Sequence, residues 1–373
     1  MSDNPFGGMF GDIFSLLGQQ GPDAWFTTAT QLALNIARGT DGDPNPEPIE
    51  RQRLEELAPL VRRHVDTLFG VSRDHALTTV NRSELTIAAL TQWRPLLGPL
   101  VTDAPSIPAE LDADANPLMA QMAATLGPLI AGFQMGSVAG HFSDRAWSLA
   151  ALPLPRLDDK SLLVVNNLKA FAEAWSLERD DVYVFALAQE FLASLVLSQS
   201  GTGDALRALL IDAVREATKA QGDLLNRLQG MVNPEDLSEL MSNPESLLDG
   251  IEIPEESDAT RAVNAAASVL LAFFDAAARE ITQTILGPRP ALVEAYKRHR
   301  LSDARGEDAA AALFGISTQG PHHDSAARFV ETIAETHGLR AFDVLLRVDG
   351  LPSASELEDP AAWYERVTNS PLA

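Results

Sequence analysis

The chain of 373 residues contains no cysteine and few basic residues. The lack of cysteine excludes disulfides, thiolate metal sites and a cysteine nucleophile, and it fits a reducing compartment. Lys and Arg number 28 against 52 Asp and Glu, which gives a net charge of -24. Phosphate groups repel so acidic a protein, so we expect neither a nucleic-acid partner nor attraction to anionic membranes. The first basic residue is Arg38, so the charged leader of a secretory signal is missing and we expect a cytoplasmic protein.

Common catalytic signatures are missing as well. There is no Gly-x-x-x-x-Gly-Lys loop, no Gly-x-Gly-x-x-Gly turn and no Gly-x-Ser-x-Gly elbow, which removes support for phosphate cradling, dinucleotide binding and ordinary serine hydrolysis. The one histidine cluster is His322 and His323, followed by Asp324. These side chains could hold a metal from a loop, but a polar start of a helix, capped by Asp324 or Ser325, is the favoured interpretation.

Helical periodicity dominates what is present. Apolar residues at helical spacing with charges on the other face predict an amphipathic helix over residues 49–71, and a long apolar pattern predicts a helix over residues 262–286. Hydrophobic residues make up 46% of the chain, enough for a substantial core. The best strand candidate is the β-branched run Leu162 to Val165, so the predicted fold is mainly α with a small β element. We expect an N-terminal apolar segment and linker over residues 1–48 and a single helical domain over residues 49–373. The apolar residues 4–20 are expected to dock on that domain, with partner binding as the alternative.

Two stretches are unusual in charge. Residues 115–143 contain no Asp, Glu, Lys or Arg, and Gly132, Gly136 and Gly140 recur within them at intervals of four. This spacing lets a second helix backbone approach closely, and interrupting polar residues and Pro128 argue against a membrane span. Residues 233–258 contain no Lys or Arg and many carboxylates, which predicts a solvated acidic excursion. A calcium site there is the less favoured alternative, because the spacing lacks the order that wraps a cation.

A further stretch, Val182 to Gln199, reads as a helix that is apolar on nearly every face, yet Gln189 and Glu190 lie at its centre. Burying such groups costs free energy unless each finds a partner. Glu190 is either the remnant of a catalytic site or the partner of a buried arginine or helix end, and the sequence leaves both possibilities open.

Several runs together resemble an actinobacterial zincin-like family whose members are labelled zinc-dependent metalloproteases or hydrolases. They are "FQMGSVAGHFSDRAWSLAALPLPR", "SLLVVNNLKAFAEAWSLERDDVYVFALAQEF", "LVEAYKRHRLSDARGEDAAAALFGI" and "ELEDPAAWYERV". They lie in the family's order between Phe133 and Val367 and so cover most of the chain. The resemblance implies a zincin-like helical fold around the buried central helix.

The resemblance also implies a zinc site, because the family's central helix typically carries His-Glu-x-x-His. Two histidines four residues apart share a helical face, and the glutamate acts as general base on zinc-bound water. Here the histidine positions hold Gln189 and Ala193, while Glu190 keeps its place. The family's further ligand is expected on a later helix, at Asp275 or Glu280.

We therefore expect no bound zinc and a non-catalytic family member that binds or scaffolds another protein. The alternative is an active metal-dependent hydrolase that builds a different site from Glu190, Asp275, Glu280 and a histidine such as His141. The sequence names neither the partner nor the oligomeric state.

Overall fold

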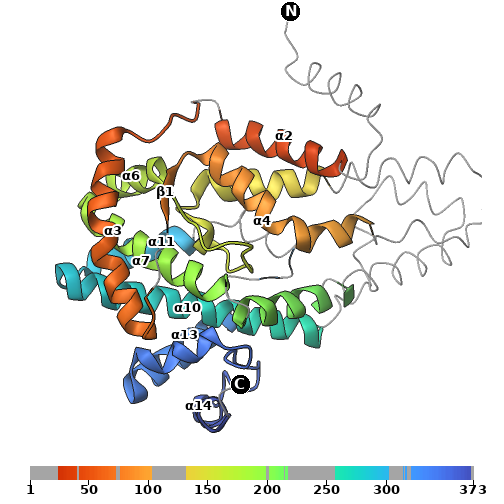
Figure 1. Cartoon of the computed structure of the whole chain (residues 1–373), viewed down its shortest axis with the longest axis vertical. Helices are drawn as coiled ribbons and strands as arrows, with labels where there is room; N and C mark the ends of the chain where they lie inside the picture. Colours follow the sequence, from red (N-terminus) through yellow and green to blue (C-terminus); the bar gives the residue numbers. More distant parts are fainter. Residues whose placement is uncertain are drawn as a thin grey trace, which may run out of the picture.

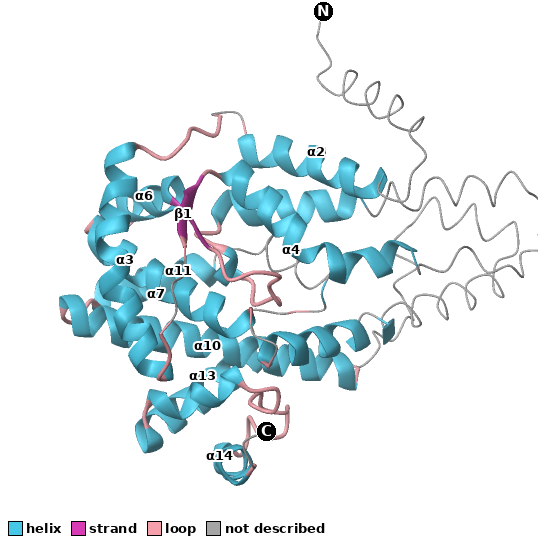
Figure 2. Ribbon diagram, in the orientation of Figure 1, coloured by secondary structure: helices cyan, strands magenta, loops and turns pink. Residues whose placement is uncertain are grey.

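The computed structural model describes residues 24–39, 42–72, 76–102, 132–198, 201–213, 215–216, 257–301, 314, 316 and 321–370. In this part of the chain helices form nearly all of the regular structure, and two short strands lie among them (Figures 1 and 2). The predicted mainly α fold with a small β element is confirmed. The segments 4–20 and almost all of 233–258 lie outside the described residues, and so do the docking and calcium interpretations attached to them.

The central helix is α7 (Arg179–Leu197), and every residue from Asp181 to Leu197 is buried. The segment contains neither Gly nor Pro, and the carboxylates of Asp180 and Asp181 in its first turn favour the positive end of the helix dipole. A helix that is apolar all round is stable only when it is covered on all sides. The predicted helix started three residues late, and its last predicted residue, Gln199, lies outside the described residues.

Two long helices cover α7. The first, α3 (Pro48–Phe69), is the amphipathic helix that the charge pattern predicts, and Gly70 ends it in the left-handed conformation with φ 64°. The second, α10 (Asp258–Leu286), begins at Ser257, whose hydroxyl accepts a hydrogen bond from the N–H of Thr260. By length and hydropathy α10 could cross a membrane, but 78% of its most apolar window is buried inside the protein, as in a core helix.

The sheet consists of β1 (Leu77–Val80) and β2 (Ser161–Val164), paired in parallel with Leu77 opposite Ser161. The strand predicted at Leu162 is therefore present, one residue earlier, because Val165 already starts α6 (Val165–Ala174). Strand β1 was not predicted, since four residues are too few to show an alternating pattern. The sheet adjoins α4 and α7, and β2 lies directly before the helix that leads into α7.

A second layer contains α2 (Ala24–Arg38), α4 (Arg82–Thr102) and a helix whose described residues are 132–145 (Figure 1). The glycine repeat lies against α2. A Cβ atom added at Gly136 would stand 2.6 Å from the carbonyl oxygen of Ala29, and one at Gly132 would stand 2.7 Å from that of Trp25. The predicted close approach of a second backbone is thus confirmed, and it occurs between two helices of this fold. Helix α2 also contributes to the main hydrophobic core.

The remaining described elements are η1 (Leu149–Ala151), a helix whose described residues include 202–213, α11 (Pro290–Leu301), α13 (Pro321–His337), η3 (Leu339–Leu346) and α14 (Pro360–Asn369). The expected capping role of Asp324 or Ser325 is wrong. Helix α13 already begins at Pro321, so the histidine pair and Asp324 lie inside its first turn.

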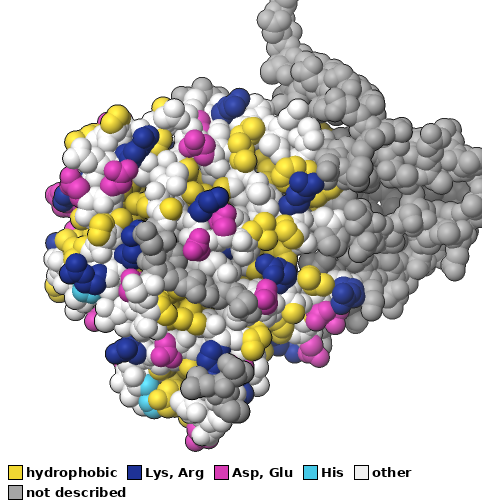
Figure 3. All heavy atoms as spheres, in the orientation of Figure 1, with side chains coloured by type: hydrophobic (Ala, Val, Ile, Leu, Met, Phe, Trp, Pro, Cys, Tyr) yellow, Lys and Arg dark blue, Asp and Glu magenta, His cyan; other side chains and the backbone are white. Residues whose placement is uncertain are grey.

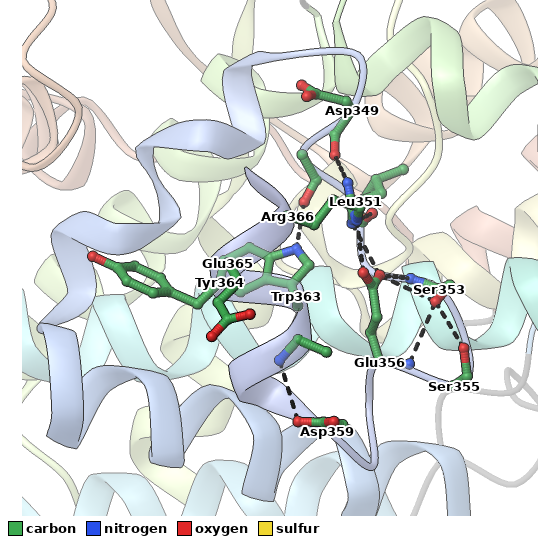
Figure 4. Close-up of polar contacts among 12 residues, drawn as sticks. Asp349, Leu351, Ser353, Ser355, Glu356, Asp359, Trp363, Tyr364, Glu365 and Arg366 are labelled. Atoms are coloured by element: carbon green, nitrogen blue, oxygen red, sulfur yellow. Dashed lines mark hydrogen bonds and ion pairs between the residues drawn. The ribbon is translucent and has the colours of Figure 1, made fainter. Parts of the chain in front are cut away.

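The C-terminal landmark "ELEDPAAWYERV" builds a clasp between a loop and α14 (Figure 4). Arg366 donates to both oxygens of Glu356, at 2.6 and 2.9 Å, and to the carbonyl oxygens of Asp349 and Leu351. The indole N–H of Trp363 donates to the carbonyl oxygen of Gly350 at 3.0 Å. The residues of this run therefore have a structural role, which is to hold the loop against α14.

Candidate functional site

Glu190 lies on the side of α7 that faces the sheet and is fully buried, with 0% of its surface exposed. Its two carboxylate oxygens accept hydrogen bonds from Nη1 and Nη2 of Arg156, at 2.8 and 2.9 Å. The backbone N–H of Leu162 in β2 donates to the same carboxylate at 3.0 Å, and that of Ala150 in η1 donates at 3.3 Å. Of the two possibilities left open by the sequence, pairing with a buried arginine is the arrangement observed.

These contacts give Glu190 a clear architectural task. A buried carboxylate is tolerated when a counter-charge and hydrogen bonds replace its hydration. One side chain here joins α7 to β2, to η1 and to the "LPLPR" loop that carries Arg156. Since both oxygens are occupied by donors, Glu190 has no lone pair directed at a water molecule to be activated.

Gln189 lies one residue earlier and points in another direction, toward α10 and α11. Its side-chain Nε2 donates to Oδ1 of Asp275 at 2.7 Å and to the hydroxyl of Tyr296 at 2.8 Å. The other oxygen of Asp275 accepts from Nη1 of Arg300 in an ion pair. We call Gln189, Asp275, Tyr296 and Arg300 the Gln189 cluster.

Aromatic rings cover one side of the cluster, around Tyr296. The Tyr296 ring packs edge-on against Phe185 and is tilted against Trp147, with centroids 5.0 and 4.9 Å apart. Burial of the phenol, followed by the negative charge of Asp275, raises the pKa of Tyr296 well above its ordinary value. Tyr296 therefore remains a neutral hydroxyl at physiological pH and serves as a hydrogen-bonding group.

A groove of about 1010 Å³ opens next to the cluster, between α3, α10, α11, α13 and η3. Asp275, Tyr296 and Arg300 line it, and small side chains such as Ala276 and Ala327 form part of its apolar surface. Its charged lining carries both signs. Basic side chains come from α10, α11 and η3, and acidic ones from α10 and α13: Arg279, Lys297, Arg300, Arg340, Asp275, Glu280, Asp324, Glu331 and Glu335. Elsewhere, the face in Figure 3 shows acidic and basic side chains interspersed.

The other predicted site residues do not join this cluster. Ala193 follows Gln189 by one turn and is fully buried. Glu280 lines the groove as an exposed residue of α10, five positions beyond Asp275. His141 lies on the helix of residues 132–145 and is half-buried. Among the described residues, no three His, Asp or Glu side chains come together in a way that could hold a metal ion.

Sequence reasoning missed three residues of the two sites: Arg156, Tyr296 and Arg300. The available signals were weak. The sequence contains an arginine directly after the "LPLP" prolines, and the helix "PALVEAYKRHRL" carries a tyrosine and an arginine four positions apart. Such a spacing places two side chains on one helical face, but it does not say which other helix they meet.

The fold and these sites define a mainly helical protein in which the Gln189 cluster occupies a polar slot beside the buried central helix. The chain belongs to the zincin-like metallopeptidase family, whose sequence profile matches residues 25–364. It is also similar to a crystal structure described as "a putative hydrolase with a novel fold" from Chloroflexus aurantiacus. That similarity has a TM-score of 0.61 and 14% sequence identity, and it covers 92% of this chain and 98% of the other. At this identity it supports the fold alone. A comparison with curated proteins gave no match.

The family implies zinc, and the residues of this chain do not fit it. A catalytic zinc takes about three strong protein ligands. The amide nitrogen of Gln189 is directed at Asp275 and Tyr296, and Ala193 offers no ligand atom. The carboxylate of Asp275 is paired with Arg300, and that of Glu190 is paired with Arg156. The slot is thus filled by protein hydrogen bonds.

Proposed function

We propose that this chain is a non-catalytic member of the zincin-like metallopeptidase family that acts by binding another protein. The observation that carries the proposal is the pair of arrangements on α7. At the two histidine positions, Gln189 is hydrogen-bonded to Asp275 and Tyr296 and Ala193 has no ligand atom, and the glutamate between them is tied to Arg156. Neither a metal-bound water nor a base to activate it has a place in this geometry.

A cleavage assay tests the catalytic half of the proposal. The full chain is incubated with a mixed peptide library and added Zn²⁺, and products are followed by mass spectrometry. We expect no cleavage above that of a heat-inactivated sample. Turnover that a chelator abolishes and excess zinc restores would establish the alternative, an active metal-dependent hydrolase, and would refute the proposal.

The groove supports the binding half of the proposal. An apolar surface with basic residues toward α11 and acidic residues on α13 suits a protein segment whose apolar side chains are flanked by charges of both signs. Ala327→Lys places a long charged side chain in the groove. The matched control is Ala361→Lys, on the exposed surface of α14 outside the groove.

The binding experiment compares wild type with these two variants. A partner purified by affinity for the wild type is identified and then titrated against all three proteins. We expect Ala327→Lys to weaken binding by at least about tenfold, because a long side chain there would obstruct the groove, and Ala361→Lys to leave it unchanged. Equal binding to all three proteins would move the interface away from the groove.

We further propose that the protein acts in the cytoplasm. The absence of cysteine from all 373 residues supports a reducing compartment. Fractionation of the source cells should recover the protein with cytoplasmic markers, and recovery from the medium or the membrane fraction would contradict this assignment.

A further inference from the structure

The Gln189 cluster contains one cationic group, the guanidinium of Arg300. Its ion pair with Asp275 is largely shielded, with 18% of the Arg300 side chain and 27% of the Asp275 side chain exposed. A carboxylate that has lost most of its hydration needs a nearby positive charge. Arg300 meets this need from within the chain.

The position of Arg300 is set by α11. It lies in the last turn of that helix, where a cation is favoured by the partial negative charge of the helix end. Tyr296 is one turn earlier on the same face and accepts from Gln189. Helix α11 thus places the Tyr296 hydroxyl and the Arg300 guanidinium on the side of α7 that carries Gln189, the proposed first histidine position.

We infer that the guanidinium of Arg300 takes the place of a metal cation in this slot. It neutralises Asp275, it is held there by the pairing, and its charge keeps divalent metals out. The inference rests on the proposed function and adds to it, because it gives two separate reasons why a metal ion is not expected in this slot. One is the replacement of both histidines, and the other is an internal cation that occupies the carboxylate.

The same geometry distinguishes the two candidates for a third ligand. Asp275 is the carboxylate that contacts Gln189, whereas Glu280 is an exposed residue of the groove. Five residues along a helix correspond to a rotation of about 500°, so the two side chains leave α10 on different faces. A site rebuilt on α7 would therefore use Asp275, and Arg300 is the group that would have to release it.

The test restores the histidines with and without the arginine. Cobalt binding is measured by visible absorption for wild type, for Gln189→His with Ala193→His, and for that double variant with Arg300→Met added. We expect little binding by wild type and weak binding by the double variant. We expect the triple variant to bind at least about tenfold more tightly than the double variant, because a unit positive charge beside the ion has been removed.

Two controls make the result specific to Arg300. Arg340→Met removes another groove-lining arginine, which belongs to η3 and not to α10 or α11, so in the double-histidine background it should leave cobalt affinity near that of the double variant. Arg300→Lys keeps a positive charge and should leave affinity near that of the double variant. Should Arg300→Met not fold, Arg300→Gln removes the charge and retains a hydrogen-bond donor for Asp275. Should Ala193→His not be tolerated, the comparison is made in Gln189→His alone.

The inference is overturned if removing the Arg300 charge leaves cobalt affinity within about twofold of the parent variant, a difference smaller than any unit-charge effect at this range. The metal content of the wild type in the same series tests the proposed function separately. It fails if the wild type already carries tightly bound metal, whatever the variants do.

Discussion

The two central residues of α7 show how differently neighbouring positions can be used. Glu190 faces the sheet, is fully enclosed and has both oxygens occupied by donors from three other segments. Gln189 faces α10 and α11, and its partners line a groove. Successive residues of a helix are rotated by about 100°, so two adjacent polar groups reach unrelated surroundings. The glutamate is part of the framework, while the glutamine holds the position that we propose for the family's first histidine.

Under the proposed function, this contrast explains how the fold is held together without a metal ion. The elements around α7 are joined through Glu190 and Arg156, which do not depend on a metal. On the other face, Gln189, Tyr296 and Arg300 satisfy Asp275 with protein groups alone. The carboxylates of Glu190 and Asp275 are therefore each paired with an arginine of this chain.

The largest predicted effect is on the framework side. Glu190→Ala leaves the Arg156 guanidinium buried without its counter-charge, and we expect a loss of about 3–5 kcal/mol in the free energy of unfolding. Urea denaturation followed by circular dichroism measures it. Arg156→Met with Glu190→Leu should recover most of the loss, because an apolar pair needs no compensation. Glu190→Gln also removes the counter-charge of Arg156 and is expected to destabilise the protein. A loss of activity in that variant would therefore not identify Glu190 as a catalytic residue.

The matched control for that prediction is the exposed ion pair between Glu294 and Arg298, one helical turn apart on α11. Glu294→Ala should cost less than about 1 kcal/mol, since solvent already screens this pair. If the buried and exposed glutamates gave similar losses, the framework role of Glu190 would be wrong.

A smaller effect is expected on the groove side. Gln189→Leu removes the amide donor shared by Asp275 and Tyr296, but Asp275 keeps its pairing with Arg300. We expect a loss of about 1–3 kcal/mol, the usual cost of leaving buried polar groups without a partner. The same denaturation experiment measures it. A loss as large as that of Glu190→Ala would abolish the distinction between the two faces of α7.

Filling the second histidine position sharpens the comparison further. Ala193 is fully buried, so Ala193→His introduces a larger polar ring into packed surroundings. We expect a destabilisation of about 1–3 kcal/mol from overpacking, measured as a lower midpoint in urea. A variant as stable as wild type would show that space for an imidazole persists at this position.

The smallest predicted effect lies in the C-terminal clasp, far from both faces of α7. Burial acts to raise the pKa of Glu356, but the hydrogen bonds from Arg366 and Ser353 outweigh it, and the pKa lies below its ordinary value of 4.5. A carboxyl group whose folded pKa is depressed contributes stability above the unfolded pKa and loses it as the pH falls through the folded pKa.

The clasp should therefore contribute fully above pH 4.5 and progressively less below it. Glu356→Gln should remove this contribution, which we place under about 1 kcal/mol because Arg366 is partly exposed. Urea midpoints of wild type and variant, compared from pH 3 to 7, should differ more at the neutral end. A difference between the urea midpoints that grew toward low pH would contradict the lowered pKa of Glu356.

Much of the fold was predictable because it depends on local patterns. The long apolar periodicity gave α7 and α10, and the charge alternation gave α3. The glycine spacing gave a close helix contact, although not its partner α2. Strand β1 escaped because a four-residue strand exists only through its pairing with β2. The histidine pair was correctly interpreted as a polar start of a helix, but α13 begins at Pro321, earlier than the predicted cap at Asp324 or Ser325.

The candidate site was predictable only in part, for a physical reason. Gln189, Glu190 and Ala193 share a helix, so a spacing in the sequence marks them. Their partners Arg156, Tyr296 and Arg300 come from other segments, and only the packing of those segments brings them together. The sequence could show that Glu190 needed a partner, but it could not say which arginine provides it.

Metal content shows whether the site beside Gln189 holds a zinc ion or is filled by protein groups. The full chain is purified without chelators or an affinity tag that binds metal, and its zinc is determined by elemental analysis. We expect zinc far below one equivalent per chain, because the described part of the chain brings no three strong ligands together. One tightly held zinc per chain, retained through dialysis, would contradict it.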